Sequence, residues 1–237
     1  MEISQGQLSR IELGTRGLKV SEVATMLSMY GAPAPRIEEL VNLVREAAEP
    51  GWWAPTGAEL PADWQAFIDF ERRATALVNY ESLRVPGLLQ TPDYARAIIS
   101  GTADAELSDT ELDTKVAARI GRQNILTRRN PPDFEVLLYE PALRIPVGNS
   151  ATMGRQLRHL LDMAERPAVS IHVIPVSAGA HPGLDSGFMI MEFNEQPALV
   201  YTNSMTRSSF LEGGDLAAYK MAVDRLRLLA LASEESA

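Results

Sequence analysis

The sequence has no cysteine and only three histidines among its 237 residues. The absence of cysteine excludes a disulfide framework, a thiolate nucleophile, an iron–sulfur cluster and a cysteine-built zinc site. No two histidines stand at a spacing typical of metal ligands. We therefore expect neither a metal nor a cofactor.

The sequence also lacks a long hydrophobic run. The longest uncharged stretch covers residues 167–184 and contains Pro167, Pro175 and Pro182. A membrane-spanning helix needs roughly 20 mostly apolar residues without such breakers. The first residues show neither the basic nor the apolar region of a signal peptide. We expect a cytoplasmic protein without a membrane partner.

The composition is that of a folded globular protein, with 46% hydrophobic and 22% charged residues. A chain of this length is long enough to bury a core. Its net charge of -9 argues against a sequence-blind nucleic-acid binder as a whole. A small local DNA-reading segment remains compatible with that charge.

Hydrophobic periodicity divides the chain into a helical first half and a second half that alternates strands with helices. Strands at 134–139 and 169–174, separated by a helix over 153–164, predict a right-handed parallel crossover. Strands at 188–193 and 198–202 predict a hairpin, and a last helix follows at about 215–232. Helices are expected earlier at 20–30, 37–48, 64–78, 92–101 and 109–120.

We therefore predict an α+β or α/β fold class. A partial all-α helix-turn-helix remnant would precede a helical segment and a small mixed sheet with packed helices. Residues 1–50 would form the partial DNA-binding region and residues 62–237 a regulatory or effector domain. Residues 51–61, which contain Pro55, Gly57 and Pro61, are expected to form a hinge.

A short polar segment near the N-terminus suggests a DNA-reading helix. Spacing of four residues places Gln5 with Ser9, and Gly6 with Arg10, on one helical face. Gln, Ser and Arg near a helix N-terminus are side chains that read base edges in the major groove. From these residue types alone, an ordinary polar helix face is the favoured explanation of the pattern.

The order of residues 4–14 resembles the recognition helix of the xenobiotic-response-element family of helix-turn-helix regulators. This resemblance implies DNA as a partner, and dimerisation, since readers of two half-sites usually dimerise. The residues that it places at base and phosphate contacts are Gln5, Gly6, Gln7, Ser9 and Arg10.

The chain departs from that family because two helices that precede the recognition helix are missing here. Residues 1–30 contain three basic and three acidic residues, which is a poor balance for neutralising phosphates. Either Met1 is a misassigned start within a longer reading frame, or the DNA-binding head has been lost. In both cases we expect this chain to bind DNA weakly or not at all.

From about residue 52 onward, the chain resembles the C-terminal domain of unknown function 5753 found in many actinobacterial regulators of that family. The matching stretches are 51–53, 85–96, 119–123, 138–144, 156–161, 173–175 and 179–181. The resemblance implies a module that senses a small-molecule effector or binds a small partner protein encoded nearby. Thr202 departs from the pattern, since an acidic residue is expected after Tyr201.

Two candidate binding residues lie in a basic part of the chain, and a third is an isolated polar residue. Arg119 and Arg122 belong to a run of five positive charges between residues 115 and 132 that contains no acid. Such a run is typical of an anion or acidic-partner site, or simply of a solvated helix face. Gln90 is a candidate because it is a polar residue between apolar ones.

Two further candidates come from the ends of predicted strands and from a glycine-rich loop. Glu140 follows an apolar strand, where clefts form in α/β sheets, although an ion pair with Arg144 or Arg122 would also explain it. His181 precedes Asp185 and Ser186, which are acid and nucleophile types without the strained G-x-S-x-G elbow. A loop that covers a cleft is the interpretation that we favour.

Three functions follow from these patterns. The leading hypothesis is a helix-turn-helix transcription regulator whose C-terminal domain senses a ligand or a partner protein. The first alternative is a stand-alone binding module without DNA binding. The second alternative is an enzyme that uses the His181 loop or the Glu140 cleft, and a pocket joining these two residues to an arginine would favour it.

Overall fold

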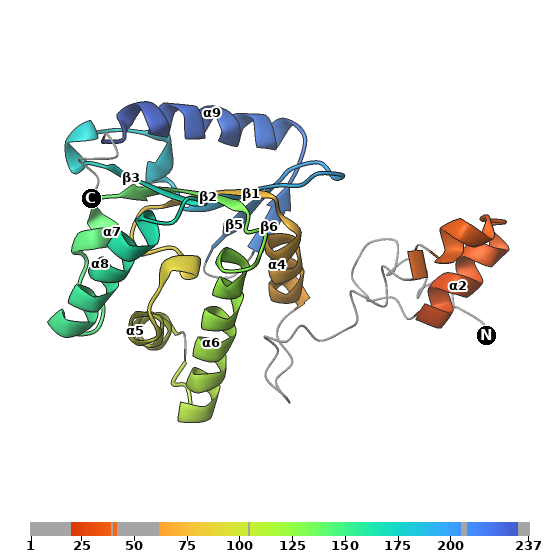
Figure 1. The fold of residues 1–237 in the computed structure, drawn as a ribbon, viewed down its shortest axis with the longest axis horizontal. Coiled ribbons are helices and arrows are strands. Elements are labelled where there is room, and N and C mark those ends of the chain that lie inside the picture. The colour runs from red at the N-terminus through yellow and green to blue at the C-terminus, as the bar shows by residue number, and fades with distance from the viewer. Residues whose placement is uncertain (1–19, 39, 42–61, 104, 205–207, 232–237) are drawn as a thin grey trace. The chain divides into compact units, whose positions relative to one another are not determined.

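A computed structural model describes residues 20–38, 40–41, 62–103, 105–204 and 208–231 (Figure 1). The chain divides into two compact units, Met1–Gly51 and Trp52–Ala237. The expected DNA-contact residues at 5–10 and the expected hinge at 51–61 lie outside the described residues.

The described part of the first unit contains helix α2 (Val20–Met29) and a helical turn at residues 34–38. Gly31 ends α2 with a φ of 70°, which a glycine adopts without steric cost. The N–H groups of Gly31 and Ala32 donate to the carbonyls of Ser28 and Leu27, as in a Schellman cap. The predicted stop at Gly31 is confirmed.

The second unit is built on a six-stranded mixed sheet with the order β3-β2-β1-β4-β5-β6. Strands β1, β2 and β3 are parallel, and β4, β5 and β6 continue the sheet in antiparallel pairs. The predicted parallel pairing and the predicted hairpin are both confirmed. The strand bounds are β1 Ala76–Glu81, β2 Asp133–Tyr139, β3 Val169–Ile174, β4 Phe188–Glu192, β5 Leu199–Asn203 and β6 Ser208–Leu211.

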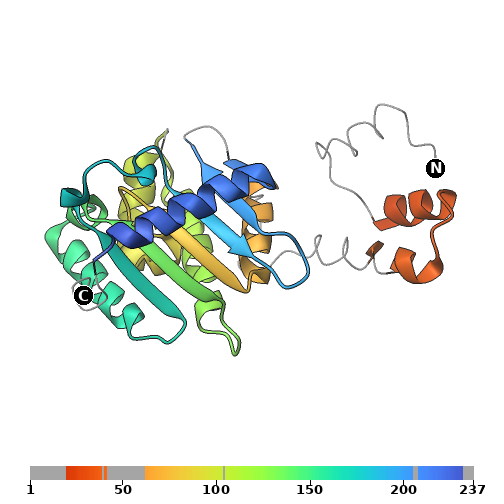
Figure 2. The same ribbon diagram turned by 90° about the horizontal axis from the view of Figure 1, so that it is seen from above.

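Helices cover both faces of this sheet, which gives an α+β fold with three layers (Figures 1 and 2). Helices α4, α5, α6 and α8 lie on one face, and α9 crosses the other face. The helical bounds are α4 Ala62–Arg73, α5 Pro92–Thr102, α6 Asp109–Arg122, α7 Pro141–Arg144, α8 Ser150–Ala164 and α9 Gly214–Leu229. Short 3-10 turns occur at η1 Gly87–Leu89, η2 Gln123–Leu126, η3 Val176–Ala178 and η4 Pro182–Leu184.

The alternation of side chains along β1 separates two hydrophobic clusters. Leu77 packs into the larger cluster, on the face that carries α4, α5, α6 and α8. Tyr80 packs into the smaller cluster beneath α9, together with Val223 and Leu226 of that helix. Asn79 and Glu81 therefore end β1 on the side of the larger cluster.

Predicted helix starts are confirmed by their caps. The Thr91 hydroxyl accepts the N–H of Tyr94, and Pro92 occupies the first turn of α5. The Ser108 hydroxyl accepts the N–H of Glu111, whose carboxylate accepts the N–H of Ser108 in return.

The prediction of one helix over residues 64–78 is wrong. Helix α4 ends at Arg73, and residues 76–81 form β1, a central strand of the sheet. The last turn of α4 carries Arg72 and Arg73. Basic side chains interact favourably with the negative C-terminal end of a helix dipole, so such a pair indicates a helix end. Strand β6 was also not predicted.

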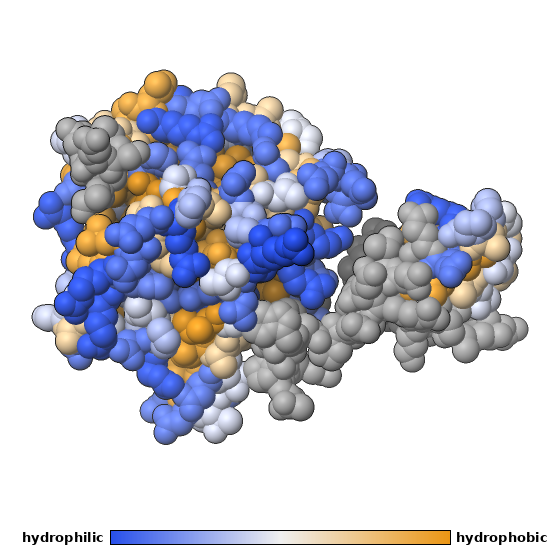
Figure 3. Space-filling view, in the orientation of Figure 1, coloured by the Kyte–Doolittle hydropathy of each residue, from blue (hydrophilic) through white to orange (hydrophobic). Residues whose placement is uncertain are grey.

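Among the described helices, none combines the length and the apolar composition that a membrane crossing requires. The face of the larger unit seen in Figure 3 is mainly hydrophilic, with apolar residues in small separate patches.

The loop between β1 and α5 is held by glutamine side chains rather than by regular backbone pairing. The amide of Gln156, fully buried, donates to the Leu89 carbonyl and accepts the N–H of Thr91, both at 2.7 Å. Gln123 donates to the carbonyls of Gly87 and Gln90 at 3.1 and 2.7 Å. Backbone polar groups of a buried loop need such partners, so these side chains determine where the loop lies.

We predict that Gln156→Met lowers the free energy of unfolding by roughly 1–3 kcal/mol, because two buried backbone groups lose their partners. Urea denaturation measures this loss. Arg158→Met, an exposed substitution on the same helix, serves as the control and should change stability by less than about 0.5 kcal/mol. Equal stability of the two variants would show that the loop is held by other contacts.

Candidate ligand-binding site

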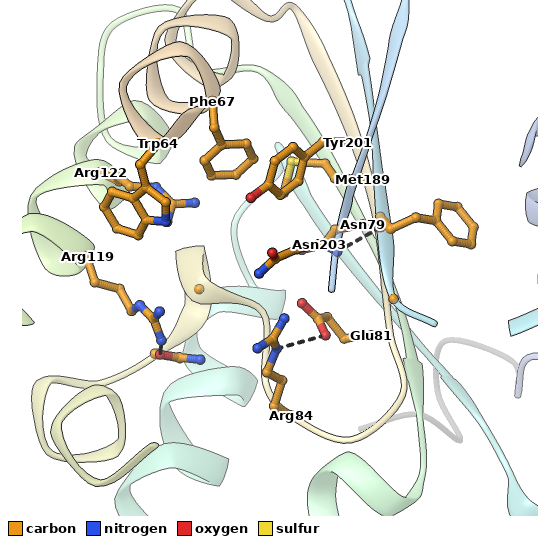
Figure 4. A pocket seen from close by; sticks show the side chains of 14 residues that line it. Trp64, Phe67, Asn79, Glu81, Arg84, Arg119, Arg122, Met189, Tyr201 and Asn203 are labelled. Carbon is orange, nitrogen blue, oxygen red and sulfur yellow. Dashed lines mark hydrogen bonds and ion pairs between the residues drawn. The ribbon is translucent and has the colours of Figure 1, made fainter. Parts of the chain in front are cut away.

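A pocket of about 100 Å³ opens where β1, β4 and β5 meet α4, α6 and η1 (Figure 4). We call it the Arg119 pocket. Its aromatic residues are Trp64, Phe67, Phe188 and Tyr201, its charged residues Glu81, Arg84, Arg119 and Arg122, and its amides Asn79, Gln90 and Asn203. Segments far apart in the sequence thus supply one mixed aromatic and charged lining.

One wall of the pocket is fixed by a buried ion pair between Glu71 of α4 and Arg122 of α6. Two parallel hydrogen bonds join the groups, from Nε to Oε2 at 2.8 Å and from Nη2 to Oε1 at 2.6 Å. The guanidinium also lies 4.6 Å from the ring centroid of Phe67 and 5.4 Å from that of Trp64. Arg122 is therefore neutralised by Glu71 and covered by the aromatic wall.

Arg119 lies one helical turn before Arg122 and has no comparable acid partner. Its Nη1 donates to Oε1 of Gln90 at 3.1 Å, and its buried Nε has no hydrogen-bond partner among the described residues. No described carboxylate lies within ion-pair distance of its guanidinium. Burial, with the nearby charges of Arg122 and Arg84, lowers the pKa of Arg119 to about 10. At neutral pH it remains cationic and underneutralised.

Glu81 supplies the negative group of the pocket, at the carboxyl end of β1. Its carboxylate accepts Nε–H of Arg84 at 3.2 Å. Burial raises the pKa of Glu81, while the Arg84 guanidinium opposes that shift. Gly187 makes room for this carboxylate, since a Cβ at that position would lie 3.0 Å from Oε2.

Two asparagines complete the polar lining. The Asn79 amide nitrogen donates to the carbonyls of Tyr80 and Phe188, at 3.2 and 3.0 Å, which leaves Oδ1 as an acceptor. The side-chain Oδ1 of Asn203 accepts from the Ser208 hydroxyl at 3.3 Å, which leaves the side-chain amide nitrogen of Asn203 as a donor. The same hydroxyl lies 3.1 Å from that of Tyr201.

The aromatic wall is continuous from α4 to the sheet. The rings of Phe67 and Tyr201 have centroids 4.2 Å apart at an interplanar angle of 33°. Trp64 lies beside Phe67 on α4, and both point toward the pocket in Figure 4. A flat apolar group would find both contact area and favourable ring geometry here.

The structure brings together three of the five predicted ligand or partner residues. Gln90, Arg119 and Arg122 all line the pocket. Gln90 is buried because its amide bridges two elements, donating to the Val85 carbonyl at 2.7 Å and accepting from Arg119. The five positive charges of residues 115–132 therefore do not form one site. Arg119 and Arg122 line the pocket, whereas Arg128 lies outside it and donates to the carbonyls of residues 72 and 74.

Glu140 lies outside the Arg119 pocket. It forms the ion pair with Arg144 that the sequence offered as the alternative to a binding role. Its carboxylate accepts from Nε of Arg144 at 2.7 Å and from the N–H of Val176 at 2.7 Å. These bonds, the backbone one first, lower the pKa of Glu140. A carboxylate already bonded on both oxygens is poorly suited to general acid or base chemistry.

His181 belongs to the cluster beneath α9, on the other face of the sheet. Its Nδ1 accepts the N–H of Gly183 at 3.1 Å, and its ring lies 4.8 Å from that of Tyr139. Gly183 approaches Tyr80 so closely that a Cβ would overlap the phenol ring. The pocket that the enzyme hypothesis required would join Glu140, His181 and an arginine, and the Arg119 pocket contains neither Glu140 nor His181.

Sequence reasoning missed Glu81, Asn79, Trp64 and Tyr201 as lining residues. The first two were missed because residues 76–78, the first half of β1, were assigned to the helix over 64–78 and no strand was predicted there. The basic pair at 72–73 is the signal that marks the helix end. The expected acid at position 202 would not have faced this pocket. Side chains alternate along β5, so Thr202 points to the face opposite Tyr201.

Within the described residues, no group of three or more His, Asp or Glu side chains is placed to hold a metal ion. The lining instead combines one underneutralised cation, hydrogen-bonding amides and an aromatic wall. Such a surface suits recognition of a small polar molecule with a flat part.

Residues 64–237 match the model of a family described as a domain of unknown function (DUF5753). The match covers most of the chain, and the chain therefore belongs to this family. Comparison with curated proteins gives no match, and comparison with solved structures gives none either.

We predict that breaking the Glu71–Arg122 pair from one side is more costly than replacing both partners. Arg122→Met should destabilise the protein by about 3–5 kcal/mol, because Glu71 is left as an unpaired buried charge. The double variant Glu71→Leu/Arg122→Met should recover much of this loss in urea denaturation. Asp93→Ala, in the exposed pair with Arg155, is the control and should cost less than about 1 kcal/mol. Additive single effects would contradict the prediction.

A second prediction concerns the pH dependence of stability at Glu81. Because its folded pKa is raised, the folded state binds more protons than the unfolded state, and the contribution of Glu81 to stability falls as the pH rises. Thermal unfolding between about pH 4 and 7 should show Glu81→Gln gaining stability over the wild type toward neutral pH. Glu140→Gln is the control of opposite sign, since its lowered pKa makes the carboxylate more stabilising toward neutral pH. A pH-independent Glu81→Gln difference would refute this assignment.

Proposed function

We propose that this member of the DUF5753 family is a transcription regulator whose domain over residues 62–237 senses a small ligand in the Arg119 pocket. The N-terminal unit would supply the DNA contacts, at Gln5, Gly6, Gln7, Ser9 and Arg10, and the protein would act as a homodimer. The sensory part of this proposal rests on the structure, and the DNA-binding part rests on the resemblance of residues 4–14 to a recognition helix.

The observation that carries the sensory part is the condition of Arg119. A partly buried guanidinium normally pairs with a carboxylate, because an unpaired charge costs desolvation energy. Here two acids of the surrounding elements, Glu71 and Glu81, bond to Arg122 and Arg84 instead. Groups held in an unfavourable electrostatic state are typical of binding sites, where the ligand supplies the missing partner.

The arrangement of the pocket also offers a way for binding to affect the rest of the domain. A hydrogen bond between Arg119 and Gln90 connects α6 to the loop before α5, and Glu81 lies close to Gly187 at the end of β1. A ligand that bonds to both Arg119 and Glu81 would stabilise one arrangement of these elements over others. This differential interaction is what a sensor requires.

The alternative is a stand-alone binding module that uses the same pocket without acting on DNA. The balanced charge of residues 1–30 favours it, since strong phosphate binding needs an excess of basic residues. A small partner protein would then be the recipient of the signal. The two functions share the pocket and differ only in DNA binding.

We predict weak binding of the chain to the DNA upstream of its own gene, measured from low salt upward. A protein-free small-molecule extract of the source cells should change this affinity about fivefold or more. Arg119→Met should bind the DNA equally well and lose the response. Lys115→Met, an exposed cation one turn earlier on α6, should keep it.

Three outcomes separate the hypotheses. An equal response of wild type and Arg119→Met would exclude the pocket as the sensory site. Absence of DNA binding at every salt concentration would reject the regulator and favour the stand-alone module. In that case, retention of extract components by the wild type but not by Arg119→Met still tests the pocket.

A further inference from the structure

We propose that the ligand of the Arg119 pocket is a small planar monocarboxylate, with one aromatic ring and a hydrogen-bond donor on the side away from the carboxylate. This inference rests on the proposed sensory function and specifies the chemistry of its ligand. Charge, shape and the positions of the acceptors each restrict that chemistry.

The charge of the pocket calls for a single negative group. Glu71 neutralises Arg122, and Glu81 is bonded to Arg84, so among the described residues of the lining Arg119 is the one uncompensated cation. Its Nη1 is used by Gln90, whereas the edge formed by Nε and Nη2 has no described partner. Two N–H groups on one edge of a guanidinium match the two oxygens of a carboxylate.

The position of Glu81 disfavours a phosphate ester in the same place. A phosphate monoester carries close to two negative charges at neutral pH. Only one of these would be compensated by Arg119, and the second would face the Glu81 carboxylate across a small pocket. A monocarboxylate avoids this like-charge contact.

The aromatic wall calls for a flat body. Phe67 and Tyr201 stand close together, and Trp64 and Met189 extend the apolar lining. Side chains of this kind contact a planar ring over a large area. A volume of about 100 Å³ is below the range of roughly 300–1,000 Å³ that holds drug-sized ligands, so one ring is favoured over a nucleotide.

The far side of the pocket calls for a donor. Both hydrogens of the Asn79 amide are bonded to backbone carbonyls, which turns its Oδ1 into an acceptor. Glu81 adds carboxylate oxygens at the end of the same strand. A hydroxyl or amino group on the ring of the ligand would donate to these acceptors. A ligand without such a group would leave the acceptors without a hydrogen-bond partner in the complex.

Calorimetric titration of the full chain tests the class with a matched set of probes. The carboxylates are benzoate and the three hydroxybenzoates, the neutral analogue is 4-hydroxybenzamide, and the dianion is phenyl phosphate. We expect at least one hydroxybenzoate to bind with one site per chain, about tenfold or more tightly than 4-hydroxybenzamide and phenyl phosphate. Benzoate, which lacks the donor, should bind more weakly than that hydroxybenzoate.

Variants identify the residue that reads the carboxylate. Arg119→Met should weaken the hydroxybenzoate about tenfold or more and leave 4-hydroxybenzamide unaffected, whereas Lys115→Met should change neither. Arg119→Lys keeps the charge without the planar edge and should bind with intermediate affinity. If thermal unfolding shows that Arg119→Met does not fold, the affinity of Arg119→Lys for the hydroxybenzoate, compared with that of the wild type, decides whether Arg119 binds the carboxylate.

Several results would overturn the proposal. Equal binding of acid and amide would exclude an anionic ligand, and tighter binding of phenyl phosphate would exclude the monocarboxylate. If no carboxylate binds while the cell extract still shifts DNA affinity through Arg119, the ligand class is wrong and the sensory function stands. If the extract response is also absent, the sensory function fails with it.

Discussion

The buried ion pair between Glu71 and Arg122 is the constraint on which the rest of the site depends. A charge taken out of water must meet its partner in good geometry, and two parallel hydrogen bonds provide that geometry here. The pair locks α4 to α6 and thereby fixes Trp64 and Phe67 opposite the sheet. It also occupies the Glu71 carboxylate, and among the described residues no ion pair is made by the preceding arginine of that helix, Arg119.

A second constraint keeps the opposite side of the pocket in place. The segment from Val85 to Thr91 contains only the short 3-10 turn η1, and the amides of Gln90, Gln123 and Gln156 bond other backbone groups of this segment. Gln90 serves two purposes, because its carbonyl oxygen also holds Arg119. Stability and recognition are therefore linked through one side chain, and changes at Gln90 should affect both.

The two faces of the sheet have different characters. The face with α4, α5, α6 and α8 carries the charged pocket, while the face beneath α9 holds the cluster of Tyr80, Tyr139 and His181. The segment from His181 to Gly187 touches both, since Gly183 lies against Tyr80 and Gly187 lies close to Glu81. Adjacent residues of β1 thus connect the pocket to the environment of α9.

The sequence by itself determined most elements with strong local signals. The caps at Thr91 and Ser108, the parallel pairing of 134–139 with 169–174 and the hairpin after Phe188 follow from short-range patterns. It also indicated Gln90, Arg119 and Arg122 as candidates, whose role as ligand contacts stays a prediction. Only the tertiary structure decided that residues 76–81 form a central strand, because burial between two layers overrides local helical periodicity. It alone decided that Glu71 neutralises Arg122 and that Gln90 bonds to Arg119, since these contacts join residues that lie dozens of positions apart in the chain.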